Sequence, residues 1–157
     1  MWQRVRRYRI GSVVVSALVG AACGATEGPV ESLRVEHAYL QRTCAPWDGP
    51  ATTLFLADGD TVSGVVPQPF LMIAVYESAS RASGKHYRMT PDDSDVGVAL
   101  ACATAEGCEA LPEAVVEFGQ LEERVPPEVT VRVLRGDGGV AEGRFTATWL
   151  EPADLCG

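Results

Sequence analysis

The sequence predicts an all-β domain, an antiparallel β-sandwich or small β-barrel of about seven or eight strands, preceded by an N-terminal signal helix. Three observations support this prediction. Short runs rich in β-branched and aromatic residues recur along the chain, and several of them alternate apolar with polar residues. Turn signals built from Gly, Pro and Asp separate the runs about every 8 to 15 residues. No stretch after residue 32 has a convincing helical period.

The first predicted strand covers residues 33–42, where apolar side chains alternate with charged ones and His37 falls on the apolar face. The members of that face are Leu33, Val35, His37 and Tyr39. Residues 44–50 form a bend, because two prolines and a glycine forbid regular structure there. Residues 52–57 predict the second strand, and residues 61–66 predict a short third strand that the prolines at 67 and 69 end.

The most apolar run after the N-terminal segment is residues 70–76, FLMIAVY, which predicts a central strand. Residues 78–84 predict a loop. Further strands are expected at 85–90, 98–102, 114–118, 129–134 and 140–150, and the last two are joined by a hairpin turn at 135–139. Phe145, Ala147 and Trp149 share one face of the final run, so we expect Trp149 to point into the core.

Residues 1–22 have the form of a secretory signal peptide. Four arginines and no acidic residue lie within residues 1–9, and residues 10–22 carry no charge. This apolar run has 13 residues, whereas a bilayer-spanning helix needs about 20. Small residues lead directly into Cys23, and this arrangement resembles the lipobox of bacterial lipoproteins, although Gly20 stands where that family prefers Leu. The alternative is an ordinary signal peptide followed by an incidental cysteine.

The lipobox resemblance implies that residues 1–22 are removed and that Cys23 carries palmitate and related acyl groups. Several acyl chains hold a protein stably at a membrane, whereas one chain holds it only marginally. Residues 23–32 then form the acylated cysteine and a flexible tether, and residues 33–157 form a single β domain. Gly24 stands where an Asp marks retention at the inner membrane, so we expect the periplasmic face of the outer membrane in the cell envelope.

The charge of the chain excludes one class of partner. The formal net charge is −8, and removal of the four N-terminal arginines leaves 9 basic and 21 acidic residues, hence −12. A strongly acidic domain binds nucleic acid and anionic lipid poorly. We therefore expect no nucleic-acid partner, and we expect the lipid group at Cys23 to provide the membrane attachment.

Four cysteines remain if Cys23 is acylated, and an even number in an exported chain predicts two disulfides. Three pairings are compatible with the sequence. We favour Cys102–Cys108, because the intervening residues 103–107 form a natural hairpin turn, and Cys44 would then pair with Cys156. A zinc site is disfavoured, since no CxxC is present and both histidines lie far from the cysteines in sequence.

Catalytic chemistry has weak support in the sequence. His37 and His86 both lie on predicted strands, no serine stands in a Gly-x-Ser-x-Gly elbow, and HExxH is absent. The acidic turn at 91–97 does not match EF-hand spacing, because Gly97 occupies a ligand position. We expect no catalytic residue, no cofactor and no metal. A small hydrolase that uses His37 or His86 is the least favoured function.

Trp47 is the candidate binding residue, because it lies in a Pro/Gly-rich bend, although packing at the end of the domain near Cys44 is the favoured expectation for it. The series Cys44-x-x-Trp47-Asp-Gly-Pro, Cys102 with Cys108, and Gly143-x-Phe-x-Ala-x-Trp149 resembles small bacterial lipoproteins without an assigned activity. We therefore expect a non-enzymatic envelope lipoprotein, either structural or binding a ligand or a protein partner. The alternative is an inhibitor or partner of an envelope protease or lysozyme, with the loop between Cys102 and Cys108 as its contact.

Overall fold

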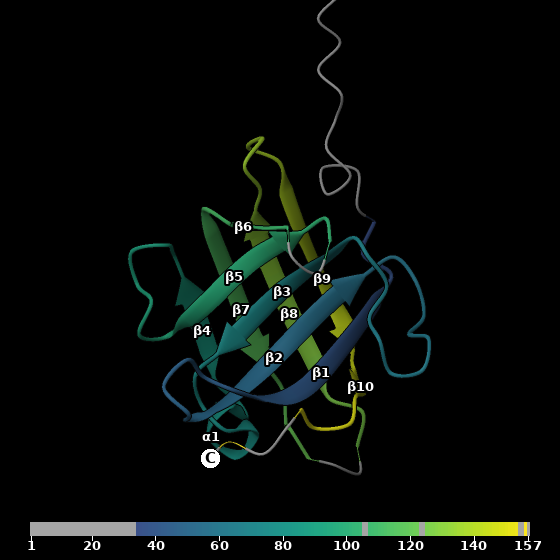
Figure 1. The fold of residues 1–157 in the computed structure, drawn as a ribbon, viewed down its shortest axis with the longest axis vertical. Coiled ribbons are helices and arrows are strands. Elements are labelled where there is room, and N and C mark those ends of the chain that lie inside the picture. Colours follow the sequence, from purple (N-terminus) through teal and green to yellow (C-terminus); the bar gives the residue numbers. More distant parts are fainter. Residues whose placement is uncertain (1–33, 105–106, 123–124, 154–155, 157) are drawn as a thin grey trace, which may run out of the picture.

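The structure is a computed structural model that describes residues 34–104, 107–122, 125–153 and 156. These residues form two β-sheets that pack face to face (Figure 1). The N-terminal signal helix, Cys23 and the tether lie outside the described residues. Within the described part of the chain, no helix has the length and hydrophobicity needed to cross a membrane.

The larger sheet has six strands in the order β10-β1-β2-β3-β5-β6. All neighbours are antiparallel except β1 and β10, which are parallel. Its strands are β1 (His37–Cys44), β2 (Pro50–Ala57), β3 (Phe70–Val75), β5 (Gly97–Cys102), β6 (Cys108–Ala110) and β10 (Thr148–Trp149).

The smaller sheet has four antiparallel strands in the order β4-β7-β8-β9. Its strands are β4 (His86–Met89), β7 (Glu113–Phe118), β8 (Glu128–Leu134) and β9 (Val140–Thr146). A single helical turn, α1 (Ala79–Ala82), lies between β3 and β4. Among the described strands the two sheets are not joined into a barrel, so of the two architectures expected from the sequence the fold is the sandwich.

The core lies between the sheets and is built by alternate residues of each strand. In β3 the inward side chains are Leu71, Ile73 and Val75, none more than 1% exposed. From the opposite sheet, β8 contributes valines at 129, 131 and 133, and β7 contributes Phe118. This alternation is the period of two that half-buried strands require.

Two predicted strands are wrong in extent. Residues 61–66 contain only an isolated bridge between Val62 and Val65, because Ser63 and Gly64 adopt positive φ angles of 53° and 78° and turn the chain back at once. Residues 140–150 form two strands in place of one. The chain leaves the smaller sheet after β9, passes the buried Ala147, and joins the larger sheet as β10.

Two short elements were not predicted. Helix α1 is one turn, closed by the Ser83 N–H to the Ala79 carbonyl at 2.9 Å, and four residues cannot show a helical period. Strand β6 has three exposed residues, so no hydrophobic alternation marks it in the sequence. With β6 and β10, the described residues contain ten strands where seven or eight were expected.

The first strand also faces the other way from the prediction. Ala38 and Leu40 enter the core, whereas His37 and Tyr39 point to the outside of the larger sheet. Both faces of β1 mix apolar with polar residues, so alternation alone does not tell which one is buried. Trp149, expected to face inward, is half-buried and packs against the core.

Candidate binding surface

The outer side of the six-stranded sheet carries many apolar side chains, and its described strand residues include no Asp, Glu, Lys or Arg. Strand pairing places Tyr39, Phe55, Met72 and Leu100 in one row across four strands. We call this surface the aromatic face. Its residues are His37, Tyr39, Gln41, Thr43, Ala51, Thr53, Phe55, Ala57, Phe70, Met72, Ala74, Tyr76, Val98, Leu100, Cys102, Cys108, Ala110 and Thr148.

Figure 1 shows no further layer of described residues in front of these strands. Six members of the aromatic face are nevertheless buried: Tyr39, Ala51, Thr53, Ala57, Ala74 and Cys102. Phe55, Phe70, Met72 and Leu100 are only half-buried, although they stand side by side on the sheet. The rings of Phe55 and Phe70 meet edge to face, with centroids 5.6 Å apart. Contiguous apolar surface of this kind marks interaction sites on soluble domains.

Aromatic residues gather on this side of the molecule. The chain has 3 Trp, 4 Tyr and 4 Phe, eleven in all, and nine remain after Trp2 and Tyr8 in the N-terminal segment are set aside. Five of these nine lie on or against the aromatic face: Tyr39, Trp47, Phe55, Phe70 and Tyr76. A sandwich normally buries its aromatic side chains between the sheets, so this distribution points to binding at the outside.

Trp47 extends the aromatic face at one end. Its ring meets that of Tyr76 edge to face, at a centroid distance of 4.8 Å, and remains 57% exposed. The bend that presents it is held by the Ala45 N–H, which donates to the Gly49 carbonyl at 2.7 Å, and by Asp48 in the left-handed region at φ 62°. Trp47 thus packs against Tyr76 at this end of the domain, while most of its ring remains exposed.

The loop between β2 and β3 borders the opposite end. Tyr39 donates a hydrogen bond from its hydroxyl to the Gly59 carbonyl at 3.0 Å, and burial raises the pKa of this phenol. Val62 and Val65, 74% and 67% exposed, form the tip of the loop. The aromatic face is thus flanked at both ends by exposed apolar side chains.

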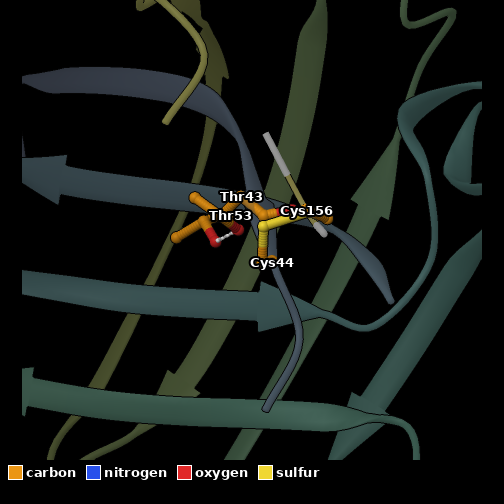
Figure 2. Close-up of a disulfide and its surroundings, with 4 residues drawn as sticks. All are labelled: Thr43, Cys44, Thr53 and Cys156. Atoms are coloured by element: carbon orange, nitrogen blue, oxygen red, sulfur yellow. Dashed lines mark hydrogen bonds between the residues drawn. A yellow bond between two sulfur atoms is a disulfide. The ribbon is translucent and has the colours of Figure 1, made fainter. Parts of the chain in front are cut away.

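Two disulfides brace the larger sheet. Cys44 at the end of β1 joins Cys156, and Cys102 of β5 joins Cys108 of β6, which are the two pairs favoured from the sequence. Figure 2 shows the first bond beside Thr43 and Thr53, whose hydroxyls lie 2.6 Å apart on the aromatic face. Residues 150–153 run along β1, since the Leu150 and Ala153 N–H groups donate to the carbonyls of Leu40 and Arg42.

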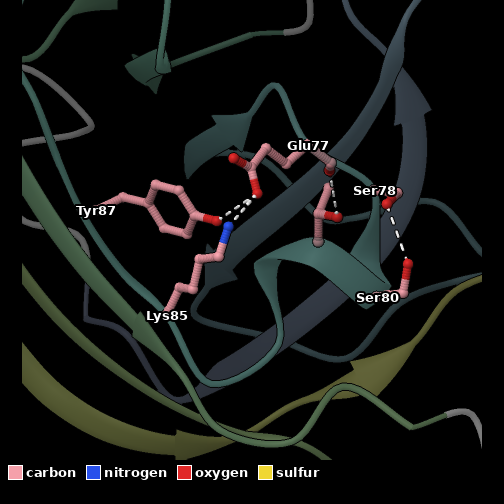
Figure 3. Close-up of polar contacts among 6 residues, drawn as sticks. Glu77, Ser78, Ser80, Lys85 and Tyr87 are labelled. Carbon is pink, nitrogen blue, oxygen red and sulfur yellow. Dashed lines mark hydrogen bonds and ion pairs between the residues drawn. The ribbon is translucent and has the colours of Figure 1, made fainter.

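A polar cluster around Glu77, the residue after Tyr76, links the two sheets (Figure 3). Glu77 follows β3 of the larger sheet, and its Oε2 accepts hydrogen bonds from Lys85 Nζ at 2.9 Å and from the Tyr87 hydroxyl at 3.0 Å. The bond from Lys85 holds the pKa of Glu77 below its usual range, and burial and the carboxylate raise the pKa of Tyr87. The Glu77 carbonyl accepts from Thr52 Oγ1 at 2.9 Å. These contacts fix the backbone that carries Tyr76.

The histidines do not form a catalytic arrangement with a nucleophile. His37 Nδ1 lies 3.2 Å from Asp60 Oδ1, but the Asp60 side chain is 88% exposed and the neighbouring ring is Tyr39. His86 is exposed on the edge strand β4. Neither histidine is among the described residues that line the cavities of about 410 Å³ and 280 Å³. His37 and Asp60 can form a surface ion pair, but they do not activate a hydroxyl or thiol group as a nucleophile.

The described residues contain no group of three His, Cys, Asp or Glu side chains placed to hold a metal ion. A cavity of about 410 Å³ lies near α1 and is lined by Arg42, Thr43, Ser78, Ser80, Pro152 and Cys156 among others. Among the described residues of its lining, Arg42 is the only ionisable one. General acid–base chemistry needs a titratable pair within reach of a substrate, and this cavity does not present one.

The other outer surface, which we call the charged face, belongs to the four-stranded sheet. Glu113 accepts a charge-assisted hydrogen bond from Arg88 and lies 3.5 Å from Arg132, which in turn approaches Glu142 at 3.9 Å. The outward ionisable residues of this sheet are His86, Arg88, Glu113, Glu117, Glu128, Arg132, Glu142 and Arg144. This is the usual solvated side of a sandwich.

Comparison with known proteins gives no match: the chain matches no family model, no curated protein and no solved structure. The resemblance to bacterial lipoproteins therefore depends on the motif residues alone. Sequence reasoning singled out Trp47 and missed the rest of the aromatic face, because that surface joins residues from six strands. A signal was nonetheless present, since residues 70–76 are apolar at every position and so leave apolar side chains on both sides of β3.

Proposed function

We propose that this chain is a non-enzymatic, lipid-anchored protein of the cell envelope whose aromatic face binds another protein. One observation carries the binding function: Tyr39, Phe55, Met72 and Leu100 form a row on a side of the sheet that has no charged residues. Phe55, Met72 and Leu100 are half-buried, and only a loop covers Tyr39. Interface cores are depleted of charge and enriched in aromatic side chains and Met. A flat surface without a catalytic pair suits binding better than chemistry.

The cysteines support an envelope location. Two disulfides, Cys44–Cys156 and Cys102–Cys108, are expected to persist only in an oxidising compartment. The basic and apolar residues before Cys23 supply the export signal and its acylation site in this proposal. The first described residue, Arg34, follows Cys23 by 11 positions, so the chain can separate it from the lipid by at most about 40 Å, at roughly 3.3 to 3.6 Å per extended residue.

The anchor is tested by the substitution Cys23→Ser in the full chain. We expect the parent to fractionate with membranes and to carry acyl groups at Cys23 by mass spectrometry, and we expect the variant to be released. Ser16→Ala, within the apolar run of the signal, is the matched control and should leave membrane association intact. A variant that stays membrane-bound as completely as the parent would sink the lipid anchor.

The binding function is tested with a photo-crosslinking amino acid at Leu100 on the aromatic face. A matched probe at Thr130, exposed on the charged face, is the control. We expect a discrete covalent adduct from position 100 in intact cells and none from position 130. Equal labelling at both positions, or none at either, would contradict the assignment of binding to this face.

A second candidate function is inhibition of an envelope hydrolase by the loop between Cys102 and Cys108. One observation favours it: the loop is cross-linked at its base and pinned by the Ala103 N–H to the Gly107 carbonyl at 3.1 Å. Such constrained loops lose little entropy on binding. Titration of the purified chain into lysozyme or a periplasmic protease tests this function, with Thr104→Arg as the loop variant and Thr130→Arg as the control.

A further inference from the structure

We propose that the aromatic face is a self-association surface, on which two copies of the chain pack their six-stranded sheets against each other in a symmetric dimer. This inference rests on the proposed function, because it identifies the protein that binds the aromatic face as a second copy of the chain. Three features of the face carry it: its lack of charge in an acidic chain, its alternation of large and small side chains, and its size.

The charge distribution selects this face for contact between copies. The chain has a formal net charge of −8, and residues 23–157 carry −12. Two such copies repel each other in general, and a contact through the charged face would remove seven charged side chains from water. The aromatic face contains no Asp, Glu, Lys or Arg, and its corner His37 is paired with Asp60. Two copies can therefore meet here without burying unpaired charge.

The shape of the face is self-complementary. Phe55, Met72 and Leu100 form a ridge of large, partly exposed side chains across the sheet, and the buried Tyr39 continues their row. The adjacent row toward Trp47 is Gln41, Thr53, Ala74 and Val98, and its two central side chains, Thr53 and Ala74, form a trough. Facing sheets pack about 10 Å apart with interdigitating side chains. A two-fold axis between ridge and trough places each ridge in the trough of the other copy, as an isologous contact requires.

The size of the face fits a reversible dimer. Five strands spaced about 4.8 Å apart, over about seven residues at 3.3 Å each, cover roughly 500 Å² per copy, hence about 1,000 Å² for two copies. That total is at the lower limit for specific interfaces. Trp47, Val62 and Val65, all more than half exposed, extend the apolar surface at its two ends. A common membrane anchor raises the effective concentration of the copies and favours such a modest contact.

The test uses the full chain in cells, with two differently tagged copies and a photo-crosslinking amino acid at Met72. We expect an adduct of twice the chain mass that contains both tags, and no such adduct with the probe at Thr130 on the charged face. Ala74→Leu fills the trough with an outward apolar side chain and should reduce the adduct about tenfold, the effect of losing one hot-spot contact. Thr130→Leu is the matched control and should leave the yield unchanged.

Correct folding of Ala74→Leu is checked by its non-reduced mass, which reports both disulfides, and by resistance to protease. An adduct with a different protein at Met72, without the doubled mass, would overturn the dimer and still support the proposed binding function. No adduct at either Met72 or Leu100 would overturn both. An undiminished doubled adduct in folded Ala74→Leu would overturn the ridge-and-trough packing on which the inference depends.

Discussion

The two outer surfaces of the sandwich differ although both belong to antiparallel sheets over the same core. The charged face of β4, β7, β8 and β9 carries Arg–Glu pairs such as Arg132 with Glu113, whereas the aromatic face carries Phe55, Met72 and Leu100. Only one of the two is a solvated surface of the ordinary kind. The difference teaches that the larger sheet is built with two apolar sides, of which the core uses one.

The covalent and ionic contacts are divided in the same way. Both disulfides brace the larger sheet, one at β1 and one between β5 and β6, while the described ion pairs among strand residues lie on the smaller sheet. A sheet with an uncovered apolar side is prone to slip and to aggregate. Cross-links at its two margins keep its register, and this allows the aromatic face to remain open.

The largest expected effect concerns these cross-links. Replacing Cys44 and Cys156 together by Ser should lower the free energy of unfolding by about 5 kcal/mol, because the bond closes a loop with a sequence separation of 112. Replacing Cys102 and Cys108, separated by 6, should cost roughly 2 kcal/mol. Urea unfolding of both double variants measures the two values. Equal losses would contradict the entropic account of why the long cross-link matters more.

A second comparison uses neighbours on one strand. Ile73 points into the core and Met72 points to the aromatic face. Ile73→Ala should destabilise the chain by about 2 to 5 kcal/mol through the cavity it leaves. Met72→Ala should cost less than about 1 kcal/mol, since its side chain is partly exposed and does not lie between the two sheets. Unfolding at low protein concentration measures the free energy of unfolding of both variants. A large loss of stability for Met72→Ala would mean that this face belongs to the core.

The Glu77 cluster gives a pH-dependent prediction of moderate size. The Lys85 and Tyr87 hydrogen bonds lower the pKa of Glu77 from its ordinary 4.5, so they favour the folded chain while the carboxylate is ionised. Their contribution is complete above pH 4.5 and is lost as the pH falls through the lowered pKa. Glu77→Gln should cost about 1 kcal/mol at neutral pH. Unfolding measured across acid pH should show a flatter profile for this variant, and parallel profiles would refute the assignment.

The smallest expected effect belongs to the charged face. Glu113→Gln removes the partner of Arg88 and Arg132, both of which are more than half exposed. Exposed ion pairs contribute about 0 to 1 kcal/mol and are weakened by salt. We expect a loss of about 0.5 kcal/mol at low ionic strength that shrinks in high salt. Urea unfolding at two NaCl concentrations checks this, and a salt-independent loss would point to packing in place of charge.

The strands of the sandwich are largely predictable from the sequence. Alternation at residues 129–134 and the apolar run at 70–76 coincide with β8 and β3 to within a residue or two. The misses have physical reasons: β6 is too exposed to show a pattern, and Val62 and Val65 belong to a turn with positive φ angles. The break at Ala147 is set by a change of sheet, which no local pattern records.

The candidate surface was predictable only at Trp47, since a Pro/Gly-rich bend indicates exposure of its side chain. The other members are spread from His37 to Thr148 and adjoin only through strand pairing. Their spacing in sequence carries no period that would group them. Strand order and register, which are long-range properties, bring them together.

By itself the sequence determined which segments become strands and where the chain turns, because backbone preferences and period-two alternation act over a few residues. Its cysteine number and spacing also favoured the two disulfides that the structure contains. The tertiary structure alone decided which side of β1, β2 and β3 is buried. Both sides of these strands carry apolar side chains, so the choice between Leu40 and Tyr39, or Ile73 and Met72, depends on what the opposite sheet covers.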